Sequence, residues 1–246
     1  MGNSKKRTFL FTFLTSIIIF FSFQLTLSQS TIYSAQTGDW QSVSTWGGGV
    51  IPGPSDSVVI SSGHRVSLAT TAGESMVSLV IEAGAVFDAQ NKTMAVTGRL
   101  IVDGTYTSDM VAAKDLSFSG DTIGGSGTIA LNDAASSLNI SSNTIIIPST
   151  RLHLLGNIYI QNGYSVTNQG RLIVSGNIDG EDAAGSVWIN DTDAALEIGD
   201  TLLDEGLLIA SASGNTIIYN HQGPQSVKTP LASTYYNLII SGTGSK

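Results

Sequence analysis

Carboxylates are the residues most able to do chemistry in this 246-residue chain, which has no cysteine and three histidines. Two carboxyl groups about 5 to 10 Å apart can hydrolyse a glycosidic bond, and oxygen ligands in irregular loops can bind calcium. The segment Asn-Asp-Thr-Asp at 190–193 is typical of a turn, in which Asn and Asp bond their own backbone, rather than of a catalytic pair on one strand. The acidic residues gather in two stretches, namely Asp179, Glu181 and Asp182, and then Asp191, Asp193, Glu197, Asp200, Asp204 and Glu205.

Neither stretch has the ligand spacing of an EF-hand or of a Gly-Gly-x-Gly-x-Asp calcium repeat. The histidines, His64, His153 and His221, lie far apart in the sequence and lack the paired spacing of zinc ligands. No Gly-x-Ser-x-Gly segment indicates a hydrolase. We therefore predict a non-catalytic chain with no metal site and no cofactor, and we keep calcium at the acidic stretches as the alternative.

Aromatic side chains offer a different chemistry, because their rings can stack on a ligand such as a sugar or can fill a core. Trp188, Tyr235 and Tyr236 are candidate ligand-stacking residues. Trp40 and Trp46 flank a short polar segment just before a glycine run. We expect these two tryptophans to cover the open first coil of the fold.

The first thirty residues predict export. Lys5, Lys6 and Arg7 precede an uncharged, largely apolar run from Thr8 to Leu27, which is the pattern of a secretory signal peptide. Small residues follow the run, and we place the cleavage within two residues of Ser28; the alternative is an uncleaved signal anchor. No later segment is apolar and long enough to span a membrane, so we expect a secreted or cell-surface protein.

The charge balance excludes nucleic acid as a partner. The formal net charge is -8, and removal of the three basic leader residues makes it -11. Binding to nucleic acid depends on Lys and Arg that neutralise phosphates, and binding to anionic lipid has the same requirement. The absence of cysteine also excludes a disulfide framework and a thiolate metal site.

Short apolar runs that alternate with polar residues and end at Gly or Asn indicate the fold. Such closely spaced strands favour successive coils of a right-handed, single-stranded parallel β-helix, an all-β solenoid in which inward residues stack in columns, over a sandwich. The runs lie at 57–60, 65–68, 78–82, 85–88, 93–97, 99–102, 105–107, 116–119, 127–131, 137–140, 144–147, 151–155, 158–161, 165–167, 171–174, 187–189, 195–198, 207–209, 216–219 and 236–241.

Two segments nearly repeat each other. Gly-Arg-Leu-Ile-Val begins both Gly98–Tyr106 and Gly170–Ile178, and Gly follows one residue later in each. Repetition of this kind maintains a stacked core and does not by itself indicate a ligand.

The segment 36–107 resembles the eight-glycine (G-eight) extracellular domain, and it is similar to a variant that opens many secreted or surface proteins of the Bacteroidetes group. The family usually has glycine immediately before the aspartate, whereas this chain has Ser55. The resemblance implies a capping module at the start of a β-helix. It is carried by Trp40, Trp46, Pro52, Asp56, Gly63, Gly84, Gly98 and Gly104.

We therefore expect a signal peptide at 1–30, an eight-glycine-like capping module with the first coils at 31–108, and further coils at 109–246. The segment Gln225–Lys246 resembles one that leads into a further strand in the same bacterial proteins, so we expect the solenoid to continue beyond it in a longer protein. The expected function is a structural or adhesive, adhesin-like surface module, present as a monomer or as part of a larger chain. The alternative is an extracellular polysaccharide-binding or polysaccharide-processing module, and the expected partners are extracellular glycans or cell-surface components.

Overall fold

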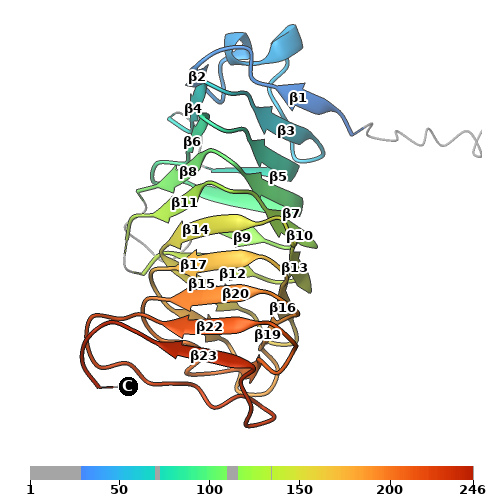
Figure 1. Ribbon diagram of the computed structural model, residues 1–246. Coiled ribbons are helices and arrows are strands. Elements are labelled where there is room, and N and C mark those ends of the chain that lie inside the picture. Colours follow the sequence, from blue (N-terminus) through green and yellow to red (C-terminus); the bar gives the residue numbers. More distant parts are fainter. Residues whose placement is uncertain (1–28, 70–72, 110–115, 134, 246) are drawn as a thin grey trace, which may run out of the picture.

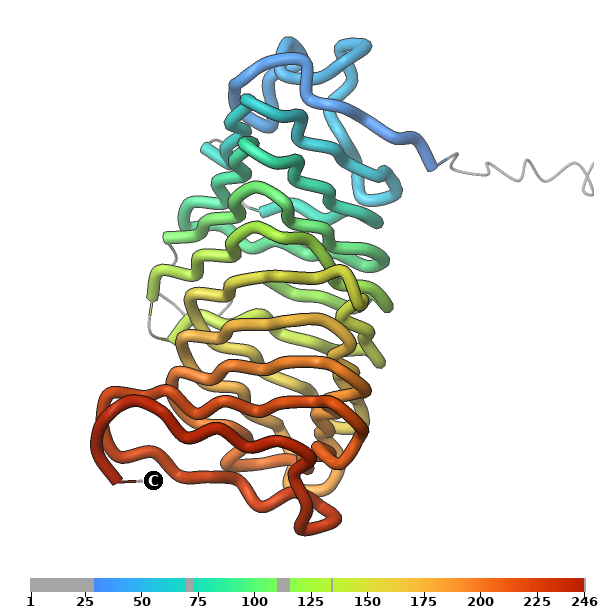
Figure 2. Tube along the Cα trace, in the orientation of Figure 1, coloured from blue at the N-terminus to red at the C-terminus, as the bar shows by residue number. Residues whose placement is uncertain are grey.

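Alternation along each strand decides the fold in the computed structural model, which describes residues 29–69, 73–109, 116–133 and 135–245. In β12 (Ser137–Ile140) and β15 (Asn157–Ile160) every second residue is buried and the residues between are partly exposed. Because successive side chains of a strand point to opposite faces, one side of each strand faces the interior and the other faces solvent. The chain coils so that these inward sides meet, which confirms the expected all-β parallel solenoid (Figures 1 and 2).

All the paired strands described run parallel to their neighbours, and they form two sheets of thirteen and ten strands. The ten-stranded sheet contains β2 (Gly38–Asp39), β4 (Arg65–Ser67), β6 (Val86–Asp88), β8 (Thr105–Ser108), β11 (Thr128–Leu131), β14 (Arg151–Leu155), β17 (Arg171–Val174), β20 (Ala195–Ile198), β22 (Thr216–Tyr219) and β23 (Asn237–Ile240).

The thirteen-stranded sheet divides into two flanks at β7 (Thr93–Val102). The first half of β7 pairs with β9 and the second half pairs with β10, so later coils have three sides. β5 (Gly73–Ile81) pairs with both halves of β7 and so spans both flanks. One flank also holds β1 (Thr31–Tyr33), β3 (Ser57–Ile60), β10 (Thr122–Gly124), β13 (Thr144–Ile146), β16 (Ser165–Asn168), β19 (Val187–Asn190) and β21 (Leu207–Ile209), and the other also holds β9 (Leu116–Phe118), β12, β15 and β18 (Ile178–Gly180).

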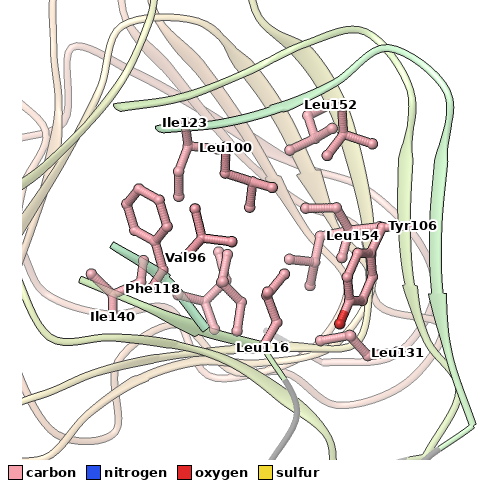
Figure 3. Packing of buried hydrophobic residues seen from close by; sticks show 14 of the residues in the cluster. Val96, Leu100, Tyr106, Leu116, Phe118, Ile123, Leu131, Ile140, Leu152 and Leu154 are labelled. Carbon is pink, nitrogen blue, oxygen red and sulfur yellow. The ribbon is translucent and has the colours of Figure 1, made fainter. Parts of the chain in front are cut away.

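The core is one cluster of apolar side chains that runs the length of the solenoid. Leu116, Leu138, Ile158 and Ile178 form a column in which each residue is in register with the next one. Figure 3 shows side chains from several strands converging in the interior, among them Leu100, Tyr106 and Phe118. Burial of one such side chain contributes roughly 1.5 to 3 kcal/mol. A single coil cannot bury its inward side chains alone, so each coil depends on its neighbours for most of its stability.

The two copies of the Gly-Arg-Leu-Ile-Val segment lie on different faces of the solenoid. Arg99–Val102 is the second half of β7 in the thirteen-stranded sheet, and Arg171–Val174 is β17 in the ten-stranded sheet. In both copies the arginine is exposed and the leucine and the valine are buried, so the same segment fits either face. The helical content that the structure describes is two short 3-10 turns, Val43–Thr45 and Gly47–Gly49. No helix in this part of the chain meets the length and hydrophobicity required to cross a membrane.

Candidate functional site

Trp40 and Trp46 close the first coil. Their ring centroids lie 4.8 Å apart in an edge-to-face arrangement, and Trp40 also meets Phe87 edge to face at 5.8 Å. The Trp46 indole Nε1–H donates a hydrogen bond of 2.7 Å to the Trp40 carbonyl oxygen, and both side chains are buried. The two rings therefore pack at the first coil of the core and offer no exposed face to a ligand.

Asp56 fixes the turn that leads into β3. One carboxylate oxygen accepts the Ser30 hydroxyl at 2.6 Å, and the other accepts the Gly53 backbone N–H at 2.9 Å. Partial burial acts to raise the pKa of Asp56, but hydrogen bonds from the Ser30 hydroxyl and from the Gly53 and Ser30 backbone outweigh it and leave the pKa lowered. Pro52 is buried beside this turn. The aspartate thus connects the start of β1 to the turn before β3, which is a structural role.

The four glycines that carry the resemblance to the eight-glycine domain meet one of two backbone requirements, a positive φ or a close approach to a neighbouring coil. Gly63 and Gly84 have φ of 79° and 78°, the left-handed region that residues with a Cβ rarely adopt. A Cβ on Gly104 would lie 2.3 Å from the Ala85 carbonyl oxygen, and one on Gly98 would lie 2.8 Å from the Val77 carbonyl oxygen. All four positions therefore serve corners or close stacking between coils.

The carboxylates of the first acidic stretch are engaged with backbone groups. One Asp182 oxygen accepts the N–H groups of Ala184 and Gly185 at 2.9 and 2.8 Å, which lowers the pKa of Asp182. Asp179 accepts the Glu205 N–H at 2.9 Å, and Glu181 accepts the Asn162 N–H at 2.9 Å. These carboxylates accept backbone N–H groups within turns and between coils.

The second acidic stretch contains the turn expected at 190–193. β19 ends at Asn190 and β20 begins at Ala195, with Asp193 at a positive φ of 58° between them. Asp191 accepts the Thr192 N–H and the Gln169 amide, and both bonds lower the pKa of Asp191. Among the described residues, no three His, Asp or Glu side chains gather closely enough to hold a metal ion.

The three histidines lie in different coils, and each contacts a neighbouring coil. His64 Nδ1 lies 2.8 Å from the Ser34 hydroxyl, His153 Nε2 lies 3.0 Å from the Ser175 hydroxyl, and His221 Nδ1 lies 2.7 Å from the Gly199 carbonyl oxygen. The structure therefore does not bring these imidazoles together.

The candidate stacking residues differ in accessibility. Trp188 is completely buried, because it lies at an inward position of β19 between Val166 and Leu208. This corrects the expectation that its ring stacks on a ligand. Tyr235 is partly buried; its hydroxyl lies 3.0 Å from that of Tyr219, and burial raises the pKa of Tyr235 well above its ordinary value. Tyr236 is 53% exposed and remains accessible to a ligand.

The structure also brings together two arginines that look scattered in the sequence. Arg151 on β14 and Arg171 on β17 are in register on adjacent strands, and both are exposed. With Leu152, His153 and Ile173 they line a surface cavity of about 230 Å³. The only sequence signal for this pair is that each arginine opens a strand of the ten-stranded sheet.

Two larger hollows lie elsewhere on the surface. One of about 440 Å³ lies between the segments 201–204 and 226–229. The other, of about 320 Å³, follows the corner after β11, β14 and β17 and is lined mostly by polar residues.

Comparisons with protein-family models, with curated proteins and with solved structures find no match to this chain. The geometry of the molecule itself therefore has to support any function.

Proposed function

We propose that this chain is a structural or adhesive β-solenoid module of an exported protein, and that it is not an enzyme. The observation that carries the proposal is the continuous core, which extends from Ile32 in β1 to Tyr219 in β22. A stack of this kind presents long, regular outer faces, and such extended surfaces are what solenoid proteins use for contact with partners. The engagement of the acidic side chains in turns also favours a structural role.

The location outside the cell rests on the first thirty residues, whose basic start and apolar run match a signal peptide. The resemblance to the eight-glycine domain is a second support, since that family is extracellular. The test is expression of the full chain in a bacterial host, with the N-terminus of the product identified by mass spectrometry. We expect protein outside the cytoplasm that begins within two residues of Ser28. A product that keeps Met1 and stays in the cytoplasm would contradict export.

The proposal that the chain is not an enzyme is tested separately with purified protein. Neutral and acidic polysaccharides are incubated with the protein, and their chain length is followed by size-exclusion chromatography. We expect no shortening of any polymer. Release of oligosaccharides by the purified protein would show an enzyme. Melting with and without calcium tests the acidic stretches, and we expect the same melting temperature in both.

A second candidate function, binding of a neutral polysaccharide, is favoured by the exposed ring of Tyr236 next to β23. An exposed tyrosine can stack on a sugar face. Tyr33 on β1 is also 53% exposed and lies at the other end of the solenoid, so Tyr33→Ala is a matched control for Tyr236→Ala. Loss of glycan binding in Tyr236→Ala but not in Tyr33→Ala would support this function. Equal binding by both variants would exclude a role for Tyr236.

A further inference from the structure

Arg151 and Arg171 lie side by side on the outer face of the ten-stranded sheet. They are partners in the register between β14 and β17, which are adjacent in Figure 1, and neighbouring strands are about 4.8 Å apart. The residues that follow them, Leu152 and Leu172, are buried. Both guanidinium groups therefore project from the same side of the sheet beside the cavity of about 230 Å³.

Neither arginine has a carboxylate partner in the described part of the chain, where the one ion pair joins Arg65 to Asp88. Arg65 lies on β4 of the same sheet, and Asp88 lies on the adjacent strand β6. The sheet therefore neutralises one of its outward arginines through an acidic residue one strand away. It does not do so for Arg151 and Arg171.

The residues around the pair explain why it is not neutralised. The position in register with Arg171 on the next strand is Ala195. The nearest carboxylate on that strand, Glu197, is in register with Ile173 and accepts the side-chain amide of Asn220. Like charges placed directly opposite each other on adjacent strands are destabilising. The chain has 19 acidic residues and 11 basic ones, so the lack of an acidic neighbour is not due to a shortage of carboxylates.

Guanidinium groups bind carboxylate, sulfate and phosphate through paired N–H groups. Two of them one strand apart can hold a single oxyanion between them, while the partly exposed Ile173 offers an apolar contact to the group that carries it. The cavity is smaller than the roughly 300 to 1,000 Å³ of sites for drug-sized ligands, so it fits one sugar unit or a group of that size. A single pair of cations on an acidic protein does not suit nucleic acid, which requires many phosphate contacts.

We propose that Arg151 and Arg171 bind the carboxylate or sulfate group of an acidic polysaccharide. This inference rests on the adhesive part of the proposed function and names its ligand class. Export and polymer cleavage are measured independently of it, so either can fail without changing the binding result.

The experiment measures binding by isothermal titration calorimetry at low salt with polygalacturonate, dextran sulfate, neutral dextran and free galacturonate. The variants are Arg151→Gln with Arg171→Gln, and a control that removes two positive charges elsewhere, Lys92→Gln with Arg99→Gln. Arg99 is an exposed arginine on the thirteen-stranded sheet. We expect polygalacturonate or dextran sulfate to bind, neutral dextran not to bind, and the Arg151/Arg171 double variant to bind at least about tenfold more weakly. The control should bind as the unmodified protein does.

Other outcomes would overturn the proposal. Binding of neither acidic polymer, or an equal loss in both double variants, would show that the pair is not a specific site. Free galacturonate that binds as tightly per sugar as the polymer would make the ligand a small sugar acid. Melting temperatures provide a further check: relief of the like-charge contact should leave the Arg151/Arg171 variant as stable as the unmodified protein or more so. A lowered melting temperature with unchanged binding would assign the pair a structural role.

Discussion

At the scale of single residues, the buried tryptophans differ in how their indole N–H groups are satisfied. Trp46 Nε1 donates to the Trp40 carbonyl oxygen, whereas Trp188 Nε1 is buried without a hydrogen-bond partner among the described residues. An unpaired buried donor costs about 1 to 3 kcal/mol. The two tryptophans therefore fill similar volumes but contribute differently to stability.

Replacement by phenylalanine should separate these contributions. Trp46→Phe loses packing volume and leaves the Trp40 carbonyl oxygen without its indole donor, while Trp188→Phe loses similar volume and removes an unpaired donor. We expect Trp46→Phe to lower the free energy of unfolding by about 1 to 2 kcal/mol more than Trp188→Phe does. Urea unfolding followed by circular dichroism measures both variants. Equal losses would show that the Trp46 hydrogen bond makes no net contribution.

The sequence predicted the roles of some residues but not their neighbours across coils. Trp46 next to a glycine run, and Asp56 after a proline pair, have local signatures, so their structural roles could be expected. The register that pairs Arg151 with Arg171 depends on coil length, and coil length varies. These two partners are 20 residues apart, whereas Arg171 and its next partner Ala195 are 24 apart. Without the length of each corner, the sequence could not indicate which outward residues meet.

Among the strands, those with two inward residues could be located from the alternation of apolar and polar residues in the sequence. β12, β14, β17 and β20 have the bounds expected from the sequence. β10 and β18 were not expected, because each is three residues long and begins or ends in polar residues or glycine. Neighbouring coils supply the hydrogen bonds that make these short segments strands, and that information is not local.

A ladder of buried asparagines connects three coils at the corner after β16 and β19. The Asn168 amide donates to the Asn190 side-chain oxygen at 2.8 Å, and the Asn190 amide donates to the Asn215 side-chain oxygen at 3.3 Å. The Asn190 amide also lies 3.2 Å from the Thr216 carbonyl oxygen. All three side chains are fully buried, and each amide nitrogen also donates to a backbone carbonyl oxygen. The side-chain oxygens of Asn190 and Asn215 accept from the neighbouring asparagine of the ladder.

Removal of the middle member should be costly. Asn190→Ala leaves a donor on Asn168 and an acceptor on Asn215 unpaired in the interior, and we expect it to lower the free energy of unfolding by about 2 to 4 kcal/mol. Asn139→Ala is the control, because the Asn139 side chain is partly exposed and contacts its own strand at the Ser137 carbonyl oxygen; we expect a change within about 0.5 kcal/mol. Chemical denaturation measures both, and similar small changes would show that the ladder contributes little.

Across the whole solenoid, the first and last coils of the described residues differ in how they are covered. The coil that contains β2 is covered by Trp40 and Trp46, which are buried. At the other end, β23 pairs with β22 on one side and with no described strand on the other, and all four of its residues are exposed. In a stack where each coil contacts only its neighbours, stability is approximately a sum of nearest-neighbour terms. Within this chain, a coil that has one paired neighbour and exposed side chains should therefore open more often than one covered by buried rings.

Hydrogen exchange followed by mass spectrometry measures this difference. Peptides that cover β23 should exchange faster than peptides that cover β14 and β17 in the middle of the stack, by a factor on the order of ten or more for the protected amides. Peptides that cover β2 should exchange more slowly than those of β23, and Trp46→Ala should remove that advantage, because it exposes the core beneath the first coil. Equal exchange along the chain would show that the solenoid opens as one cooperative unit, in which case the tryptophan pair would stabilise all coils rather than protect its own end.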